Sequence, residues 1–166
     1  AEFPMKRLLA AGIGDCYELG RVFRDGEAGG RHNPEFTMLE WYRVGWDHLR
    51  LIDESAELVR AALSLIGRDA SRYRDIYRDA LGIDPFIASE DDLRAALGDV
   101  EIDPVGLSRD DWLDLLMTHR LQPAFDPGSL LAIIDYPASQ CALARLRDDG
   151  DGLPVAERFE LYLGSI

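Results

Sequence analysis

Two short strand-like runs on either side of a glycine-rich stretch constrain this chain most. Residues 16–23, Cys-Tyr-Glu-Leu-Gly-Arg-Val-Phe, alternate with the period of two that is typical of a β-strand. Residues 36–42, Phe-Thr-Met-Leu-Glu-Trp-Tyr, are aromatic and favour a second strand. Between them, residues 25–34 contain three glycines and a proline, a composition typical of a loop. The sequence therefore predicts a long β-hairpin over residues 16–46.

Beyond the hairpin, the pattern becomes helical. Apolar residues recur at spacings of three and four over residues 48–66 and predict a helix that Gly67 ends. Ser89 and Ser108 are suitable N-caps for two further helices. A short helix is also expected over residues 2–11, before the hairpin.

Two more strands are expected near the end of the sequence. Residues 129–136 form an apolar run of the buried type, and residues 155–163 alternate. The stretch from about 48 to 125 is predicted to be a helical insertion. Strands that neighbour one another in hairpin fashion favour an antiparallel β-sheet flanked by helices. The expected fold class is therefore α+β, over residues 1–166.

The charge is unevenly distributed along the chain. It has 18 Lys and Arg residues against 31 Asp and Glu residues, a formal net charge of −13. A field of that sign repels polyanions, so a generic nucleic-acid or anionic-membrane binder is not expected. Residues 21–50 are the Arg-dense, charge-neutral exception and include His32 and His48. If the chain binds a nucleotide phosphate, this segment is the expected place, although the charge pattern alone favours simple pairing of its arginines with nearby surface acids.

The composition also bears on the cellular setting. No apolar run approaches the roughly 18–20 residues that a membrane helix needs. The two cysteines, Cys16 and Cys141, are too few for a disulfide framework, which predicts a reducing, cytoplasmic setting. The chain begins Ala-Glu-Phe-Pro and ends within an alternating run. We therefore expect it to be part of a longer polypeptide.

One face of the predicted hairpin carries groups suited to a nucleotide. Alternate residues of a strand share a face, so Arg24 should lie beside Phe36, Glu40 and Tyr42. The ring could stack on a base, worth roughly 1–3 kcal/mol. The arginine could bind a phosphate, and Glu40 and Tyr42 could hold a second, cationic substrate. An ordinary amphipathic hairpin with a core aromatic residue and a salt bridge would show the same pattern.

The segment around this face resembles motif 2 of the class II aminoacyl-tRNA synthetases in its lysyl form. The similarity lies in Phe23-Arg24, the glycine-rich loop and the run Arg31-His-Asn-Pro-Glu-Phe-Thr-Met-Leu-Glu-Trp-Tyr42. Tyr136-Pro-Ala-Ser-Gln140 is closer to the shortened lysyl-tRNA synthetase paralogues that modify elongation factor P. The resemblance implies part of a class II catalytic domain.

The resemblance implies an ATP site on the hairpin. Arg24 matches the motif 2 arginine that contacts the ATP α-phosphate, and it is the expected catalytic residue, since it would stabilise charge that develops as the amino-acid carboxylate attacks. His32 matches a loop residue near the γ-phosphate. Phe36 matches the ring that stacks on adenine, and Asn33 lies beside it.

The resemblance also implies a site for a lysine-like substrate and a metal. Glu40 and Tyr42 match the pair that binds the amino groups of lysine or β-lysine, and Glu2 matches a further substrate-binding glutamate. Glu160 matches a glutamate that coordinates Mg²⁺ beside ATP.

The chain departs from the family pattern in two respects. The family motif runs Phe-Arg-x-Glu, whereas Gly26 stands here in place of the glutamate, with Asp25 and Glu27 as candidate replacements. Motif 1, which forms the family's dimer, would precede residue 1, and motif 3, with its ATP-binding arginine, would follow residue 166. We therefore expect a partial catalytic domain, inactive alone, from a homodimeric parent protein.

Three functions fit these patterns. The first is ATP-dependent activation of lysine or β-lysine as an aminoacyl-adenylate and transfer to a lysine of elongation factor P. The second is the catalytic core of a true lysyl-tRNA synthetase that charges tRNA, which the acidic charge disfavours. The third, suggested by Gly26, is a catalytically silent nucleotide-binding relative.

Overall fold

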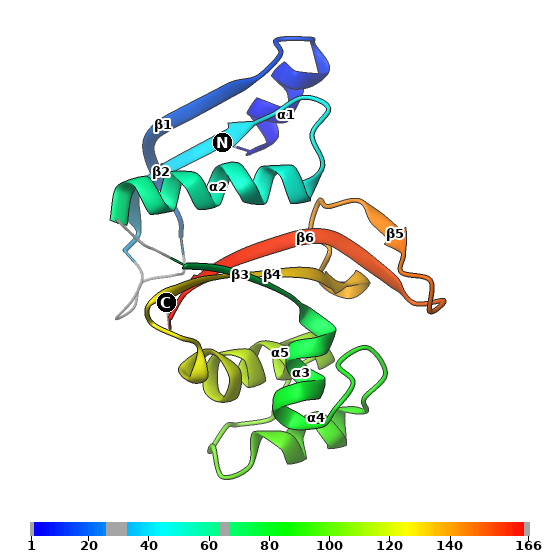
Figure 1. Cartoon of the computed structure of the whole chain (residues 1–166). Helices are drawn as coiled ribbons and strands as arrows, with labels where there is room; N and C mark the ends of the chain where they lie inside the picture. Colours follow the sequence, from blue (N-terminus) through cyan, green and yellow to red (C-terminus); the bar gives the residue numbers. More distant parts are fainter. Residues whose placement is uncertain (1, 26–32, 64–66, 165–166) are drawn as a thin grey trace. The chain divides into compact units, whose positions relative to one another are not determined.

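The computed structural model describes residues 2–25, 33–63 and 67–164, and the chain divides into two compact units, residues 1–47 and 48–166 (Figure 1). The first unit consists of helix α1 (Glu2–Ala10) and strands β1 (Cys16–Phe23) and β2 (Glu35–Tyr42). The strands pair antiparallel without a break, from Cys16 opposite Tyr42 to Phe23 opposite Glu35. The two predicted hairpin strands and the predicted N-terminal helix are confirmed.

The second unit is a four-stranded sheet with helices on both faces. Its strands lie in the order β3-β4-β6-β5, and Figure 1 shows α3, α4 and α5 on one face and α2 on the other. The α+β class is confirmed. The elements are α2 (His48–Leu63), β3 (Gly67–Arg72), α3 (Tyr73–Leu81), α4 (Glu90–Leu97), α5 (Arg109–Leu116), a π-helical turn (Met117–Leu121), β4 (Ser129–Pro137), β5 (Leu146–Asp148) and β6 (Pro154–Leu163).

Strand β3 lies within the stretch predicted as a helical insertion, about residues 48–125, and was not predicted. Gly67 begins this strand and does not end a helix. The strand pairs in parallel with β4, so the sheet is mixed and not purely antiparallel. Its sequence, Gly-Arg-Asp-Ala-Ser-Arg, lacks apolar alternation and β-branched residues. The strand forms because the edge of β4 offers unpaired backbone groups, an effect that local sequence does not carry.

The core of the second unit lies between the sheet and helices α3–α5. Tyr73 and Tyr77 are fully buried at its centre, with their rings stacked 4.7 Å apart between centroids and their hydroxyl oxygens 2.8 Å apart. The Tyr77 hydroxyl donates to the Leu113 carbonyl at 2.6 Å, so burial leaves it paired. The apolar residues packed around the two rings include Leu93, Leu97, Trp112, Leu116, Ile133 and Tyr136.

Helices α4 and α5 begin where the sequence predicts. Ser89 and Ser108 each accept a hydrogen bond from the backbone three residues on, and the Asp92 and Asp111 carboxylates accept from the Ser89 and Ser108 backbone in return. Both predicted N-caps are therefore confirmed as capping boxes. The cap at Ser108 fixes the start of α5, which matters below because this helix presents Asp110 and Asp114.

Strand β4 contains an irregularity at Asp135. Its φ is +59°, and the register with β6 shifts between Ile134 and Tyr136. Aspartate is one of the few residues besides glycine that adopt this left-handed conformation. The Asp135 side chain is buried and forms ion pairs with Arg72 (Nε–Oδ2, 3.4 Å) and Arg147 (Nη2–Oδ1, 2.6 Å).

Asp149 closes this arrangement into a ring. Its two carboxylate oxygens lie 3.1 Å from Arg72 Nη1 and 3.0 Å from Arg147 Nη1. We call these four residues, Arg72, Asp135, Arg147 and Asp149, the ion-pair ring. The ring joins Arg72 of β3, Asp135 of β4, Arg147 of β5 and Asp149 of the β5–β6 turn, so it links the two edge strands of the sheet.

Candidate active site

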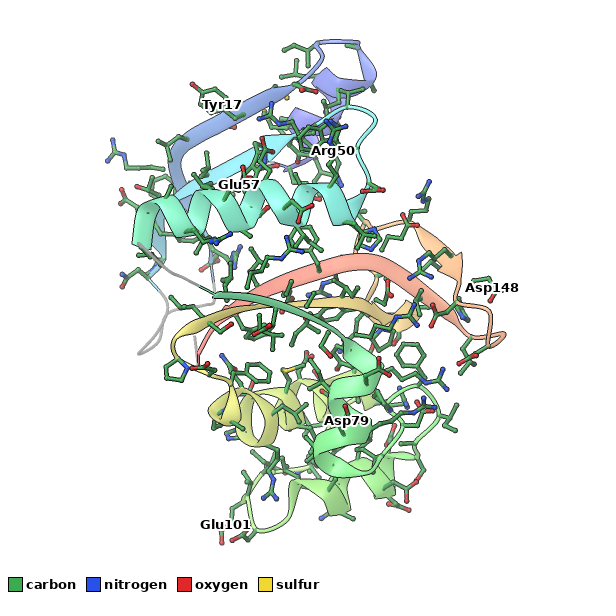
Figure 2. The ribbon with its side chains drawn as sticks, viewed as in Figure 1. Tyr17, Arg50, Glu57, Asp79, Glu101 and Asp148 are labelled. Carbon is green, nitrogen blue, oxygen red and sulfur yellow. The ribbon has the colours of Figure 1, made fainter. Side chains whose placement is uncertain are left out.

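The β1–β2 hairpin presents one face on which the predicted ligand-binding residues gather. Along β2, Phe36, Met38 and Glu40 are half-buried, whereas the residues between them are exposed. Register places Cys16 opposite Tyr42, Glu18 opposite Glu40, Gly20 opposite Met38 and Val22 opposite Phe36. We call this set of residues, extended by Arg24, the hairpin face. Tyr17 belongs to the other face and is 75% exposed (Figure 2).

An arginine and an aromatic ring meet at one end of the hairpin face. The guanidinium carbon of Arg24 lies 5.4 Å from the centroid of the Phe36 ring, which is cation–π distance. The Arg24 amide donates to the Pro34 carbonyl at 2.9 Å and continues the strand pairing by one step. Asn33 is exposed just before β2. His32, Gly26 and Glu27 lie outside the described residues.

A carboxylate and a phenol meet at the other end. The Tyr42 hydroxyl donates a hydrogen bond to Glu40 Oε1. The second oxygen, Glu40 Oε2, is buried and has no hydrogen-bond partner in the described parts of the chain. Burial raises the pKa of Tyr42 above its ordinary value, and the hydrogen bond and negative charge of Glu40 raise it further. Tyr42 is therefore a neutral donor, and Glu40 keeps one buried acceptor oxygen that the described residues leave unpaired.

Two further carboxylates lie near this pair. Glu2, in the first turn of α1, pairs with Lys6 at 2.8 Å, and its charge also raises the pKa of Tyr42. The structure thus brings Glu2, Glu40 and Tyr42 together. Glu18 lies directly opposite Glu40, a position at which side chains are about 5 Å apart at Cβ. The sequence analysis missed Glu18, although its even spacing from Arg24 along β1 is a signal that could have found it.

The predicted metal ligand Glu160 lies in the second unit, on β6. Tyr162 Oη donates to its Oε2 at 2.8 Å, and Arg158 donates to its Oε1. Metal-binding carboxylates are commonly held by such hydrogen bonds. The described residues contain no group of three or more His, Cys, Asp or Glu side chains placed for a metal. Glu160 therefore fits Mg²⁺ as a single protein carboxylate, because Mg²⁺ keeps several waters and binds substrate phosphates.

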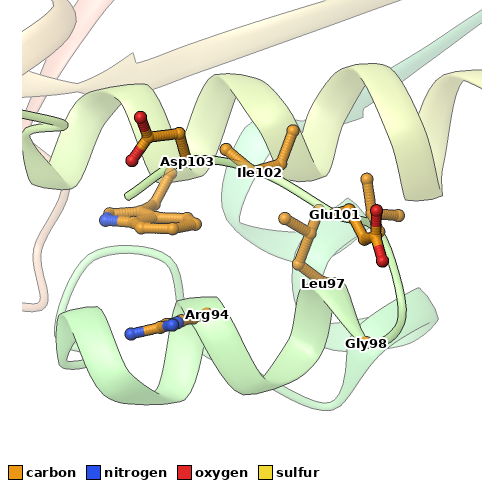
Figure 3. A pocket seen from close by; sticks show the side chains of 8 residues that line it. Arg94, Leu97, Gly98, Glu101, Ile102 and Asp103 are labelled. Carbon is orange, nitrogen blue, oxygen red and sulfur yellow. The ribbon is translucent and has the colours of Figure 1, made fainter. Parts of the chain in front are cut away.

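A pocket of about 500 Å³ also lies in the second unit, beside α4 and α5. Figure 3 shows Arg94, Glu101 and Asp103 among the side chains that line it. Among the described residues, no predicted site residue contributes to its lining. Elsewhere, the described helices include none that combines the length and apolar character needed to cross a membrane.

Comparison with known proteins decides the family. The family model for class II tRNA synthetases (D, K and N) matches residues 1–166. This chain belongs to the class II tRNA synthetase family. The family match covers both compact units, so the hairpin and the mixed sheet are parts of one class II synthetase region.

Among proteins of this synthetase class, the chain is similar to several named Elongation factor P--(R)-beta-lysine ligase. It is 40% identical over 168 residues to the protein from Vibrio campbellii and 41% identical to that from Vibrio parahaemolyticus, alignments that cover 99% of this chain and 51% of each relative. The Pseudoalteromonas translucida protein is 41% identical over 164 residues, covering 97% and 50%. The chain therefore spans about half the length of the curated relatives it matches. The resemblance predicted from motif 2 is confirmed.

Proposed function

We propose that the polypeptide containing this chain activates lysine or β-lysine with ATP and transfers the resulting acyl group to a lysine of elongation factor P. The observation that carries the proposal is the hairpin face. It has a cation beside a ring at one end and a buried, unpaired carboxylate oxygen at the other. The name of the similar proteins, Elongation factor P--(R)-beta-lysine ligase, supports the choice of substrate and acceptor.

Arg24 and Phe36 would serve the nucleotide half of the reaction. The substrate carboxylate oxygen attacks the α-phosphorus of ATP, and the bond from that phosphorus to pyrophosphate breaks. Arg24, as a permanent cation, stabilises the charge that develops on the phosphoryl oxygens. Phe36 stacks on the base, and Asn33 and His32 are expected to contact the nucleotide from the loop.

The acidic end of the hairpin face would hold the amino groups of the substrate. Glu40 Oε2 accepts a hydrogen bond from the substrate ammonium, while Tyr42 keeps Oε1 in place. Glu2 and Glu18 add negative charge on the same side of the hairpin. In the second step, the amine of the acceptor lysine attacks the acyl carbon, and AMP leaves.

Glu160 would hold Mg²⁺ through a carboxylate oxygen. Bound Mg²⁺ neutralises negative charge on the phosphates and on the departing pyrophosphate. The proposal includes a homodimeric parent protein, to be tested by sedimentation equilibrium. It also includes a cytoplasmic setting, in keeping with Cys16 and Cys141, which are both free thiols.

The test uses the full-length polypeptide that contains residues 1–166. We expect ATP–pyrophosphate exchange that depends on lysine or β-lysine, followed by a mass increase on elongation factor P equal to the acyl group. Charging of tRNA together with an unmodified elongation factor P would instead identify a lysyl-tRNA synthetase. ATP binding without pyrophosphate exchange would identify a catalytically silent nucleotide-binding relative.

A further inference from the structure

Arg158, on β6, is held from three directions. Its Nη1 donates to the Gln140 carbonyl at 2.7 Å, and its Nη2 donates to Glu160 Oε1. Its guanidinium carbon lies 4.7 Å from the centroid of the Tyr136 ring. A planar guanidinium bound at two nitrogens and stacked on a ring has little freedom to rotate.

The groups that hold Arg158 are themselves fixed. Tyr136 is 3% exposed and belongs to the core. Gln140 ends the short 3₁₀ turn Ala138–Gln140, and its side-chain amide donates to Asp114 at 2.9 Å. Ser139, in the same turn, donates to Asp110 at 2.8 Å. The turn is thus attached to α5 at two places, so the carbonyl that receives Arg158 has a defined position.

Glu160 receives a donor on each oxygen. Arg158 binds Oε1, and the Tyr162 hydroxyl binds Oε2. The carboxylate plane is therefore set by its neighbours before any ligand arrives.

We propose that Arg158 is a positioning residue for Glu160. Arg158 bonds both the Gln140 carbonyl, in a turn attached to α5, and the Glu160 carboxylate. It therefore fixes the orientation of the carboxylate and so sets the affinity for Mg²⁺ bound together with ATP. The inference rests on the proposed function, which places Mg²⁺ at Glu160. It adds a residue that neither motif 2 nor the relatives' names single out. It also gives a physical role to the Pro-Ala-Ser-Gln stretch, whose last residue supplies the carbonyl.

The test measures binding rather than turnover. Isothermal titration of ATP into the full-length polypeptide, repeated across a series of Mg²⁺ concentrations, gives the Mg²⁺ concentration for half-maximal enhancement of ATP affinity. We expect Arg158→Met to raise that concentration about 10-fold, the size typical of losing a partner that orients a metal ligand. Arg158→Lys keeps the positive charge but lacks a planar guanidinium that bonds two groups at once, so it should raise the same Mg²⁺ concentration by a smaller factor. ATP affinity without Mg²⁺ should stay unchanged in both.

Arg145→Met is the matched control. Arg145 directly precedes β5, pairs with Glu157 at 2.7 Å, and is 74% exposed, so its removal deletes the same charge without removing a partner of Glu160. Its Mg²⁺ dependence should equal that of the unmodified protein. Wild-type Mg²⁺ dependence in Arg158→Lys and Arg158→Met would overturn the inference. If Arg158→Met fails to fold in a thermal melt, Arg158→Lys decides the question by the same criterion.

Glu160→Gln separates this inference from the proposed function. If Glu160→Gln abolishes the Mg²⁺ enhancement while the Arg158 variants keep it, only the positioning role fails. If Glu160→Gln also keeps it, the assignment of Mg²⁺ to Glu160 fails, and the role of Arg158 fails with it.

Discussion

The hairpin face in residues 1–47 and the ion-pair ring in residues 48–166 both hold buried carboxylates, but the two differ in the charge of the groups that face these carboxylates. In the ring, Asp135 and Asp149 each form ion pairs with both Arg72 and Arg147. Asp135 Oδ1 accepts no hydrogen bond among the described residues, but the Arg147 guanidinium lies 2.6 Å from it. On the hairpin face, Glu40 has one oxygen bound by Tyr42 and the other buried without a partner among the described residues.

The difference teaches how to separate structural charges from functional ones in this molecule. A buried charge without a partner costs folding free energy, whereas a matched set ties elements together. The ring connects β3, β4 and the β5–β6 turn, a structural task. For the hairpin face, we propose instead that the unpaired oxygen of Glu40 binds a ligand. Variants of the two regions should therefore affect different measurements: folding stability for the ring, and substrate binding or rate for the face.

The largest expected effect is at Arg24. Arg24→Ala should lower the rate of pyrophosphate exchange about 10²–10³-fold, because a preorganised cation no longer faces the charge that develops on phosphorus. The free energy of unfolding, from urea titration, should fall by at most about 1 kcal/mol, because the side chain is exposed and its contact with the Phe36 ring is worth about that much. A rate within threefold of the unmodified protein would show that Arg24 does not act on the reacting phosphate.

Asp135→Asn should have the largest effect on stability. Asparagine tolerates the left-handed backbone, so the change removes mainly the charge. We expect the free energy of unfolding, from urea titration, to fall by about 3 kcal/mol, the low end for breaking a buried ion pair. The loss stays at the low end because Arg72 and Arg147 still pair with Asp149 and are 47% and 31% exposed. Arg21→Gln, which removes the exposed pair with Glu35, should produce no measurable loss. Equal losses in both variants would contradict a special role for the ring.

Asp84, a second ion-paired carboxylate in residues 48–166, should make folding stability depend on pH. Burial alone would raise its pKa, but hydrogen bonds from Arg74, the Phe86 amide and Arg78 outweigh burial and lower the pKa from 3.8 to about 2. The lowered pKa stabilises the folded state by about 2 kcal/mol. This stabilisation is complete at pH values above the ordinary pKa of 3.8 and is lost as the pH falls through about 2. Asp84→Asn should lose this amount at pH 7. Its urea midpoint should also vary less than that of the unmodified protein between pH 4 and pH 2.

Glu40→Gln tests the functional side. The KM for the lysine-like substrate should rise about 10-fold, since the ammonium loses a charged acceptor, while the KM for ATP stays the same. Stability should not fall, because the variant removes a buried charge that lacks a full set of partners. A marked loss of stability with an unchanged KM would show that Glu40 stabilises the fold and does not bind the substrate. Tyr42→Phe, which frees Glu40 Oε1, should raise the same KM by a smaller factor.

The smallest expected effect is at Glu18. Glu18→Gln should weaken binding of the lysine-like substrate by about threefold, because the side chain is exposed and solvent screens its charge. Glu35→Gln, on the opposite face of the same hairpin, should leave the affinity unchanged. Identical affinities for the two variants would show that Glu18 does not contact the substrate.

Much of the fold could be predicted from the sequence. Strands β1, β2, β4 and β6 and the N-caps of α4 and α5 were predicted, because each has its own pattern of alternation, apolar residues or capping. Strand β3 could not be, since it depends on the edge of β4, and β5 is only three residues long. The ion-pair ring joins positions from 72 to 149, so only the tertiary fold brings its members together.

The candidate site divides in the same way. That Arg24, Phe36, Glu40 and Tyr42 share a face follows from the period of a strand, and the structure has them so. Their chemical roles came from the resemblance and stay predictions, as do those of Glu2, Asn33, His32 and Glu160. The unpaired oxygen of Glu40 and the three contacts of Arg158 depend on side-chain placement, which no local pattern in the sequence encodes.

The parallel pairing of β3 with β4 has a consequence for the order of folding. Each β3–β4 pair joins residues separated by the whole of α3, α4 and α5, whereas β5 and β6 close over a short turn. Closing the longer loop costs more chain entropy, and non-local pairing is the slow step of folding. We expect β5–β6 and the capped helices to form first and β3 to dock last. In pulse-labelled hydrogen exchange, the amides of residues 69–72 should therefore gain protection after those of β6, and earlier protection in β3 would contradict this order.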